Sequence, residues 1–474
     1  TGSLQKLIGQ FVDSTGGVST HWEPHGYTSI VEASRLAFGV AAAPRYDIAN
    51  AEVIVSFGAN FLQTWLSPLH HAKGWGKARG IENGPIAEFY AIEPRVSHSS
   101  ARADTWYSTA PGTEAGVAMA LAKLVADKNG IEAPTLVNYV SGVDVAANAE
   151  RAGVSLEKLT ALADKLAGSS SKSVIFPGGV ANSGTNATDL ALATLVLNGV
   201  CGNIDQTVHI GATSLGQVDS YQAVASVLDS ATNGDVSVLF VDGLDPSFNL
   251  PSGAGFSTAA ANAGLVVVLG NSMPEGMPAN AILLPTGSAI ESWGDSSSSS
   301  EFIGLQQPAM RKLYDTKSVG DSILAIAKSA GLTTSPPAVA DAESGADESA
   351  DVAVIPGVDL NGTTAIADFS AVDFQHYVAG RWYDEAYLTS GSTSSFGNWW
   401  NDALVKGGVD VQLTAVNTIF LTDVPPVSTG TTIDGTALML FPHSHLGDGR
   451  HANKAWLQEV PDPMSGYSWG TWAE

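Results

Sequence analysis

Residues 53–60 read Val53-Ile54-Val55-Ser56-Phe57-Gly58-Ala59-Asn60. The short apolar run, rich in β-branched side chains, predicts a strand buried on both faces, as in a parallel sheet. It runs directly into a turn that begins at Gly58, and a helical pattern opens at Pro68. A glycine at the carboxyl end of such a strand lets a phosphate approach the backbone. Because nearly every α/β domain contains one ordinary tight turn of this kind, the pattern alone assigns no function.

Strand and helix patterns alternate on both sides of this stretch. The first 128 residues show two strands and three helices, at residues 31–38, 53–57, 68–77, 89–92 and 113–127, with Thr113 as the expected N-cap of the last helix. Residues 129–330 continue in the same way, with strands at 174–176, 236–241, 265–269 and 281–284 and helices at 189–198 and 221–230. This alternation predicts two doubly wound α/β domains with parallel sheets.

The composition changes after residue 330. Residues 331–352 are rich in Ser, Pro, Ala, Asp and Glu and predict an acidic linker. Beyond it, residues 353–474 show short apolar runs at 418–421 and 437–441 between turn-forming residues, which favours a mostly-β, barrel-like C-terminal domain. The predicted fold class is therefore α/β, with two parallel-sheet domains followed by a β-rich one.

Charge and hydropathy exclude several classes of partner. The 474 residues contain 47 acidic and 22 basic side chains, for a net charge of −25. Nucleic-acid affinity depends on neutralising phosphates with Lys and Arg, so we expect no nucleic-acid partner. No uncharged apolar stretch reaches the roughly 18–20 residues that cross a bilayer, so any attachment to a membrane would have to go through partner subunits.

Cysteine usage limits the redox chemistry of the chain itself. Cys201 is the only cysteine, so these residues cannot build a disulfide, a Cys-ligated zinc site or an iron–sulfur cluster. Any such cluster must lie on another polypeptide. Cys201 follows an apolar run and is expected to be a buried structural thiol.

Four motifs that follow strands or open a helix occur in order within sixty residues, at residues 56–60, 92–95, 103–104 and 111–114. Together they resemble the guanine-dinucleotide-binding domain of the molybdopterin oxidoreductases, the dimethyl sulfoxide reductase family. The resemblance continues through residues 174–205, 281–285, 291–295 and 447–463. Within the family, residues 65–68 and 291–295 are most similar to the molybdopterin-like subunit of bacterial alternative complex III, which oxidises quinol.

The resemblance implies five vestigial cofactor-binding candidates: Gly58, Asn60, Glu93, Arg95 and Gly112. Each also has a plain structural interpretation, as part of a tight turn, a salt-bridged turn or a capped helix. The family commonly has an Arg before Pro-Gly-Thr, where this chain has Ala110, and the loss of that charge weakens a dinucleotide pocket.

Other departures from the family concern metal. Catalytic relatives begin with a four-cysteine cluster domain and supply a thiol, hydroxyl or carboxylate ligand to molybdenum, here near residues 19–25. Ser19, His21, Glu23 and His25 could bind a metal, but Pro24 interrupts the helix that the histidine spacing requires. The histidines at 443, 445 and 451 surround a turn at Asp448. We expect ordinary polar loops, and no metal site, at both places.

These gaps imply a non-catalytic, structural subunit of a membrane-bound, quinone-linked respiratory complex. We expect no cofactor on this chain and a peripheral location on the periplasmic face. The implied partners are an iron–sulfur subunit, multihaem cytochrome c subunits and integral-membrane quinone-binding subunits. One alternative is a catalytic molybdenum or tungsten bis-pterin oxidoreductase that binds molybdopterin guanine dinucleotide and has its cluster domain elsewhere. The other is a soluble nucleotide-binding protein.

Overall fold

The computed structural model describes residues 2–23, 27–131, 133–179, 184–211, 218–251, 253–297, 302–333, 367–411, 418–422, 425–430, 435–439, 443–447 and 449–469. The chain forms two compact units. Unit 1 comprises Thr1–Glu23 and Ser214–Leu413, and unit 2 comprises Pro24–Thr213 and Thr414–Glu474. The four domain ranges expected from sequence stay predictions.

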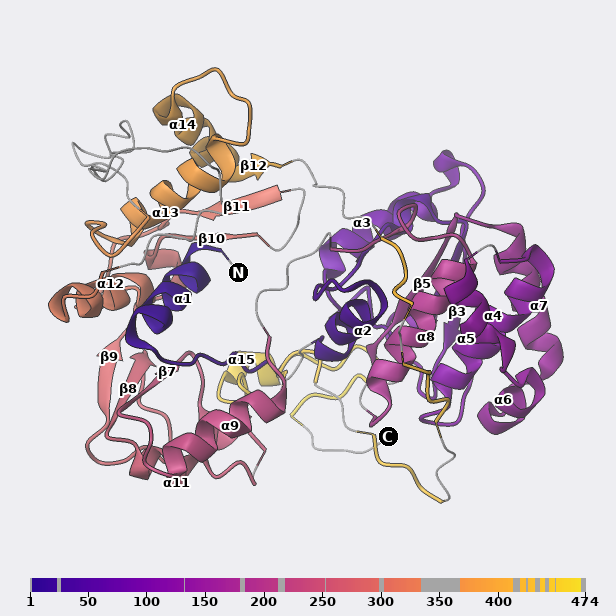
Figure 1. The fold of residues 1–474 in the computed structure, drawn as a ribbon, viewed down its shortest axis with the longest axis horizontal. Helices are drawn as coiled ribbons and strands as arrows, with labels where there is room; N and C mark the ends of the chain where they lie inside the picture. Colours follow the sequence, from indigo (N-terminus) through magenta and orange to yellow (C-terminus); the bar gives the residue numbers. More distant parts are fainter. Residues whose placement is uncertain are drawn as a thin grey trace. The chain divides into compact units, whose positions relative to one another are not determined.

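Unit 2 contains a four-stranded parallel sheet in the order β4-β3-β2-β5. Figure 1 labels two of its strands, β3 and β5. Its strands are β2 (Val53–Phe57), β3 (Glu88–Ile92), β4 (Thr105–Tyr107) and β5 (Ser173–Pro177). All five residues of β2 are buried, as the sequence predicts for a central strand. The strand order reverses at β2, because β3 and β4 extend the sheet on one side and β5 on the other. The sequence analysis placed β5 in a second α/β domain, but it pairs with β2 along its whole length.

Helices cover one face of this sheet. Val53, Val55 and Phe57 of β2 share a core with α4, α7 and α8. The helices of unit 2 are α2 (Thr28–Phe38), α3 (Pro68–Ala78), α4 (Glu114–Asn129), α5 (Pro134–Ser141), α6 (Val145–Ala152), α7 (Leu156–Gly168), α8 (Ala187–Val200) and α15 (Ala455–Gln458). A short ladder of β1 (Arg45–Tyr46) and β6 (Val208–His209) completes the unit. The predicted helices at 31–38, 68–77, 113–127 and 189–198 are confirmed.

Aromatic side chains form a second cluster in unit 2, around Phe176 of β5. The Phe176 ring lies 4.9 Å from that of Phe61 and 5.3 Å from that of Trp65, and Trp65 stacks on His71 at 5.5 Å. Burial of His71 lowers its pKa to about 4, so the ring is neutral within this cluster. The segment between β2 and α3 is thereby packed against the sheet.

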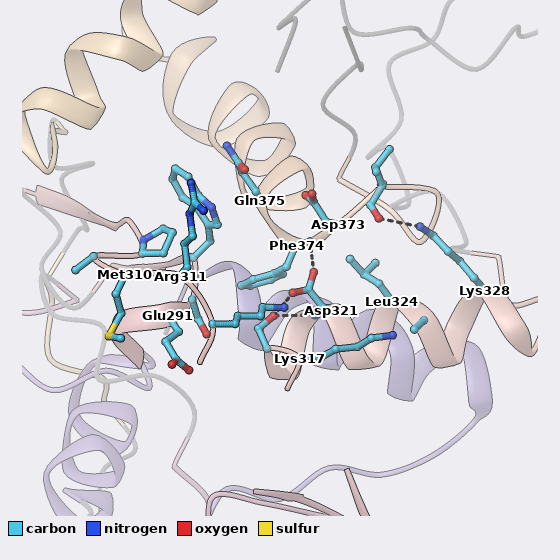
Figure 2. A pocket seen from close by; sticks show the side chains of 18 residues that line it. Glu291, Met310, Arg311, Lys317, Asp321, Leu324, Lys328, Asp373, Phe374 and Gln375 are labelled. Atoms are coloured by element: carbon cyan, nitrogen blue, oxygen red, sulfur yellow. Dashed lines mark hydrogen bonds between the residues drawn. The ribbon is translucent and has the colours of Figure 1, made fainter. Parts of the chain in front are cut away.

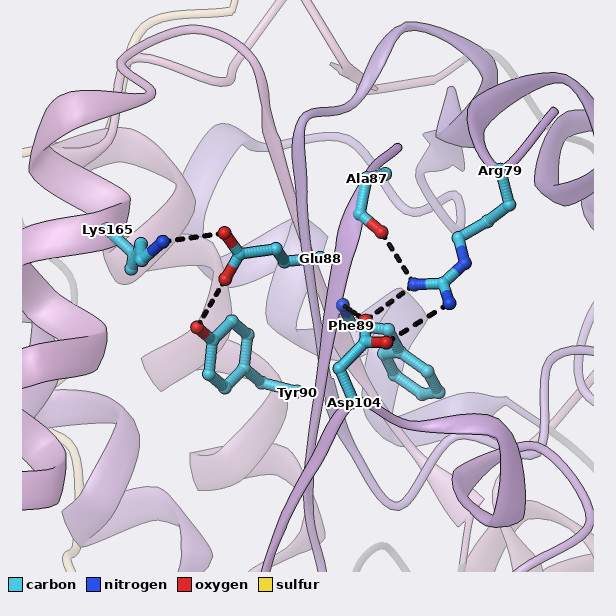
Figure 3. A network of polar contacts seen from close by, with 7 residues as sticks. All are labelled: Arg79, Ala87, Glu88, Phe89, Tyr90, Asp104 and Lys165. Carbon is cyan, nitrogen blue, oxygen red and sulfur yellow. Dashed lines mark hydrogen bonds and ion pairs between the residues drawn. The ribbon is translucent and has the colours of Figure 1, made fainter. Parts of the chain in front are cut away.

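A polar network fixes the amino ends of β3 and β4 (Figure 3). The Arg79 guanidinium donates to the Asp104 carboxylate at 2.5 Å and to the Ala87 carbonyl at 2.7 Å, and Asp104 also accepts the Phe89 N–H. Lys165 and Tyr90 both donate to the Glu88 carboxylate. Asp104, part of the ordered family motifs, is thus a structural residue at the sheet edge opposite the carboxyl ends.

Unit 1 combines two small sheets. The parallel sheet β7-β8-β9 packs against α9 and α11, and the antiparallel sheet is ordered β10-β11-β12. Its strands are β7 (Val238–Asp242), β8 (Leu265–Gly270), β9 (Ile282–Pro285), β10 (Gly294–Ser296), β11 (Phe302–Gln306) and β12 (Gly408–Asp410). Its helices are α1 (Ser3–Thr15), α9 (Tyr221–Thr232), α10 (Pro246–Asn249), α11 (Phe256–Asn262), α12 (Val319–Ser329), α13 (Phe374–Trp382) and α14 (Phe396–Lys406), with a π-helix at Tyr383–Tyr387.

The expected β-rich, barrel-like C-terminal domain is not confirmed. Among the described residues after 352, β12 is the one named strand, and it pairs with β11 from residues 302–306. Residues 418–421, predicted as a strand, do not form one. Of the strand predicted at 437–441, residues 437–439 are not a strand, and residues 440–441 lie outside the described residues. The described residues form helices instead, and the side chains of Asp373 and Ser395 cap the amino ends of α13 and α14. Most of the predicted linker, residues 334–352, lies outside the described residues, and no described helix is long and apolar enough to cross a membrane.

A buried side chain of α8 binds the backbone in the middle of the edge strand β5. Asn198 of α8 donates to the carbonyls of Ile175 and Thr194, both at 2.9 Å, and its Oδ1 accepts from Ile175 N at 3.3 Å. The side chain of Asn198 thus pairs with the N–H and the carbonyl of Ile175, as a neighbouring strand would.

We predict that Asn198→Ala lowers the free energy of unfolding by about 2–4 kcal/mol, because it leaves buried backbone groups of Ile175 without partners. Urea denaturation measures the change. Asn138→Ala, at an exposed helix position, is the control and should stay within about 0.5 kcal/mol of the parent. Equal stability of the two variants would contradict the role of Asn198.

Candidate functional site

The candidate site is the carboxyl edge of the sheet in unit 2. In open parallel sheets ligands bind beyond the carboxyl ends of the strands, where the strand order reverses. Here that point lies between β2 and β5. Gly58 follows β2 with a φ of 85°, a left-handed conformation that favours glycine.

Asn60 lies in the loop after β2, where its side-chain amide makes three hydrogen bonds within the chain. Its Oδ1 accepts from the N–H of Ser99 at 3.1 Å and from the Ser99 hydroxyl at 2.8 Å. Its Nδ2 donates to Gln63 at 2.6 Å. Asn60 therefore ties the loop after β2 to the loop after β3.

Glu93 directly follows β3 and is 1% exposed. Its Oε1 accepts the Ser97 N–H at 3.1 Å, whereas Oε2 has no hydrogen-bond partner. Burial raises the pKa of Glu93, although the hydroxyls of Ser100 and Ser97 and the positive charge of Arg95 oppose the shift. Of the predicted residues, the structure therefore gathers Asn60, Glu93 and Arg95 around the serine-rich loop 97–100.

Gly112 lies apart from that group, in the turn that leads into α4. It has a φ of 84°, and its carbonyl accepts from Asn186 at 2.8 Å. Thr113 is the N-cap residue of α4, as predicted, but its hydroxyl donates to the Ala110 carbonyl instead of capping the helix.

Glu114 is a candidate that the sequence analysis missed. It is 1% exposed, and its Oε1 has no hydrogen-bond partner. Burial raises its pKa to about 7, although the backbone N–H groups of Glu114 and Gly112 oppose the shift. An acidic residue directly after Pro111-Gly112-Thr113 was the available signal.

The loop after β5 is a second feature that the sequence analysis did not single out, although it noted the glycines there. Gly178 and Gly179 have φ values of 124° and 71°. A Cβ on Gly179 would lie 1.3 Å from the Gly58 carbonyl oxygen, and one on Gly178 would lie 2.1 Å from Nε1 of Trp65. The loops after β2 and β5 are therefore in direct backbone contact.

Residues 425–430 cover the amino ends of α4 and α8. Ser428 N donates to Asp189 at 2.8 Å, and Arg151 donates to the Thr429 hydroxyl at 3.0 Å. A Cβ on Gly430 would lie 2.0 Å from the Gly112 carbonyl oxygen. We call residues 425–430 the strap, because they lie across both helix ends.

The metal candidates do not form a ligand cluster in the structure. His21 faces Asp219, with Nδ1 3.5 Å from the carboxylate, while His25 and Asp448 lie outside the described residues. Nδ1 of His443 accepts from the backbone N–H groups of His445 and Leu446. Within the described ranges, no three His, Cys, Asp or Glu side chains are arranged to hold a metal ion.

The contact between the two loops can be tested with Gly179→Ala. We predict that it lowers the free energy of unfolding by about 1–3 kcal/mol, because the new methyl group meets the Gly58 carbonyl and the backbone has a positive φ. Thermal and urea denaturation measure the effect. Gly142→Ala, with open space around its Cβ position, is the matched control. A Gly179→Ala variant as stable as the control would show that the loops do not touch.

The buried carboxyl group of Glu114 should make stability depend on pH. Burial raises the pKa of Glu114 from 4.5 to about 7 in the folded protein. The contribution of this group to the free energy of unfolding is therefore fully present below pH 4.5 and is lost as the pH rises to about 7. The difference corresponds to about 3 kcal/mol. Between pH 4.5 and pH 8, the free energy of unfolding should therefore fall by about that amount more in the parent than in Glu114→Gln. The exposed substitution Glu150→Gln is the control and should fall as the parent does. Parallel pH profiles for the parent and Glu114→Gln would contradict the assignment.

Comparison with known proteins places this site in a family. The family model for molybdopterin oxidoreductases matches residues 4–328. The molybdopterin-binding-like subunit of menaquinone reductase from Nitratidesulfovibrio vulgaris is 23% identical over 352 residues, 70% of this chain and 50% of that protein. Dimethyl sulfoxide reductase DmsA from Haemophilus influenzae is 30% identical over 145 residues, 29% of this chain and 17% of that protein.

A solved structure has the same fold. Acetylene hydratase from Pelobacter acetylenicus superimposes with a TM-score of 0.54 at 14% identity, over 69% of this chain and 54% of that one. The chain spans half the length of the menaquinone reductase subunit that it matches. Since the family model covers more than half of the residues, the chain belongs to the molybdopterin oxidoreductase family.

Proposed function

We propose that this chain is a non-catalytic, structural subunit of a membrane-bound, quinone-linked respiratory electron-transfer complex. One observation carries the proposal: the chain's own loops fill the point between β2 and β5 where a parallel sheet of this kind binds its ligand. The contact of Gly179 with the Gly58 carbonyl at this point supports a family framework whose ligand crevice is closed.

The residues at this edge do not fit the family's dinucleotide cofactor. A phosphate would have to approach the backbone at Gly58, whose carbonyl is in contact with Gly179. The Asn60 amide is taken by Ser99 and Gln63. At the amino end of α4, the Gly112 carbonyl is covered by Gly430 of the strap and bonded to Asn186. No chemical step of this chain is therefore assigned to the cofactor.

The chemistry of Cys201 supports the same proposal. The side chain is fully buried, and burial raises the pKa of the thiol to about 12, although a hydrogen bond with Ser173 opposes the shift. A thiol held neutral in this way is a poor ligand for iron or molybdenum, since the thiolate is the ligand form. In the complex that we propose, the redox centres lie on partner chains.

The partners in this proposal are an iron–sulfur subunit, multihaem cytochrome c subunits and integral-membrane quinone-binding subunits. The relative from Nitratidesulfovibrio vulgaris is a menaquinone reductase subunit, which supports the link to quinone. This chain would hold the partners' centres close enough for electrons to pass between them, as a peripheral subunit on the periplasmic face. Trp456, Tyr467 and Trp469, which are 67%, 67% and 62% exposed, are suited to such interfaces.

One observation favours a second candidate, a catalytic molybdenum or tungsten bis-pterin oxidoreductase. Glu93 and Glu114 each have a buried carboxylate oxygen without a hydrogen-bond partner. Such oxygens could accept hydrogen bonds from a ribose or a base. We rank this candidate second, because the closed crevice would have to open before a dinucleotide could reach these oxygens.

Cofactor analysis of the complex purified from membranes decides between the candidates. We expect iron and haem to co-purify with the chain, without stoichiometric molybdenum, tungsten or pterin, because the crevice is closed. Elemental analysis and the fluorescence of oxidised pterin are the measurements. A catalytic member of the family, purified in parallel, must yield its molybdenum and is the control.

Each of the other outcomes identifies a rival. Stoichiometric molybdenum or tungsten together with pterin would overturn the structural role and establish the catalytic one. Retained guanine nucleotide without pterin, in a chain isolated alone, would favour a soluble nucleotide-binding protein.

A further inference from the structure

Unit 1 contains a cavity of about 800 Å³ that is separate from the site described above (Figure 2). Its walls come from the loop 308–312, from α12 and the residues that lead into it, and from the start of α13. A volume of this size suits a small organic ligand.

Positively charged side chains gather at this cavity. Arg311, Lys312, Lys317 and Lys328 all line it, in a chain with 22 basic and 47 acidic residues. Within the described part of the chain, the side chains of Arg311, Lys312 and Lys317 form no ion pair or hydrogen bond, and Lys328 donates to the carbonyls of Ala371 and Val372. Within the described structure, therefore, none of these four cations forms an ion pair with a carboxylate.

The acidic residues of the cavity are already satisfied by other donors. Glu291 accepts from the backbone N–H groups of Ser288 and Leu313. Asp321 accepts from the Ser318 hydroxyl at 2.7 Å and from Phe374 N at 2.8 Å.

Asp373, the third carboxylate of the lining, is likewise bound within its own helix. It accepts from the N–H of His376 and lies 2.6 Å from Nδ1 of that ring. Four cations thus face three carboxylates, none of which forms an ion pair with them in the described structure, and the cavity keeps an excess of positive charge.

An apolar surface completes the cavity. Trp293, Leu324 and Phe374 line it, and Phe374 is 3% exposed. Phe374 is held against Gly320, where a Cβ would lie 2.3 Å from the ring. A ligand could therefore place an anionic group on the cations and an apolar or aromatic part on these rings.

We propose that unit 1 binds a phosphate-bearing ligand with an apolar part in this cavity. Arginine and lysine together suit phosphate, because the guanidinium offers a planar pair of donors and the ammonium a compact charge. The amino end of α12, capped by Ser318, adds a partial positive charge to the same wall. The phosphate can come from a free phosphate ester or from a phospholipid headgroup.

Calorimetric titration of the full chain with inorganic phosphate and with phenyl phosphate, at constant ionic strength, tests the proposal. We expect saturable binding, tighter for phenyl phosphate because its ring contacts Trp293 and Phe374. Arg311→Ala/Lys317→Ala should weaken binding by about tenfold or more, since two charge-assisted contacts are lost. Lys6→Ala/Lys406→Ala, which removes the same charge from elsewhere in unit 1, should change the affinity by less than about twofold.

Vesicles identify the source of the phosphate. Co-sedimentation with phosphatidylglycerol vesicles that is lost in Arg311→Ala/Lys317→Ala would support the proposal and assign the ligand as a phospholipid. Binding of phenyl phosphate without binding to vesicles would support it and assign a free phosphate ester. Absence of saturable phosphate binding, or equal weakening by the Lys6→Ala/Lys406→Ala control, would overturn it. Circular dichroism of each variant checks that it is folded.

Discussion

The parallel pairing of β2 with β3 on one side and β5 on the other is the constraint on which unit 2 depends. Parallel strands bring their carboxyl ends to one edge, so the pairing places the turns at Gly58, Glu93 and Gly178 together. The same pairing decides where the strand order reverses, and hence where a ligand crevice could form. In this chain the loops on either side of that point touch through Gly58 and Gly179.

The carboxyl groups at this edge show how much of the framework survives. Glu93 and Glu114 are both almost fully buried, and burial raises the pKa of each. Desolvation of a carboxyl group costs stability unless donors compensate for it, and each residue has only part of its oxygens satisfied. The chain therefore retains two unfavourable groups where the fold would present acids to a nucleotide. These two carboxyl groups are the features that most favour the catalytic alternative, whereas the backbone contact of Gly58 with Gly179 favours the structural role.

Unit 1 shows that the net charge of a chain says little about its local potential. A net charge of −25 argues against a broad anionic partner surface, yet four cations line one cavity, beside carboxylates that are bound by the chain's own donors. For anion binding, the hydrogen bonds that Glu291 and Asp321 accept from the chain are as important as the presence of Arg311 and Lys317, because they keep these carboxylates from pairing with the cations. Such an arrangement requires the ends of α12 and α13 to meet, and these are separated by more than forty residues of sequence.

The sequence by itself determined the local elements and the family. Runs such as 53–57 and 265–269 predict buried strands because β-branched residues pack well on a pleated surface, and the helical spacing of 113–127 predicts α4. The order of turn motifs predicted the molybdopterin oxidoreductase family, which the family model bears out. Short apolar runs such as 418–421 were misleading, because a strand needs a partner as well as a propensity. Tertiary structure alone decided that β5 pairs with β2, that Gly179 contacts Gly58, and that Glu114 is buried. Each of these depends on contacts between residues far apart in the chain, and no local pattern of side chains specifies which distant backbone will supply them.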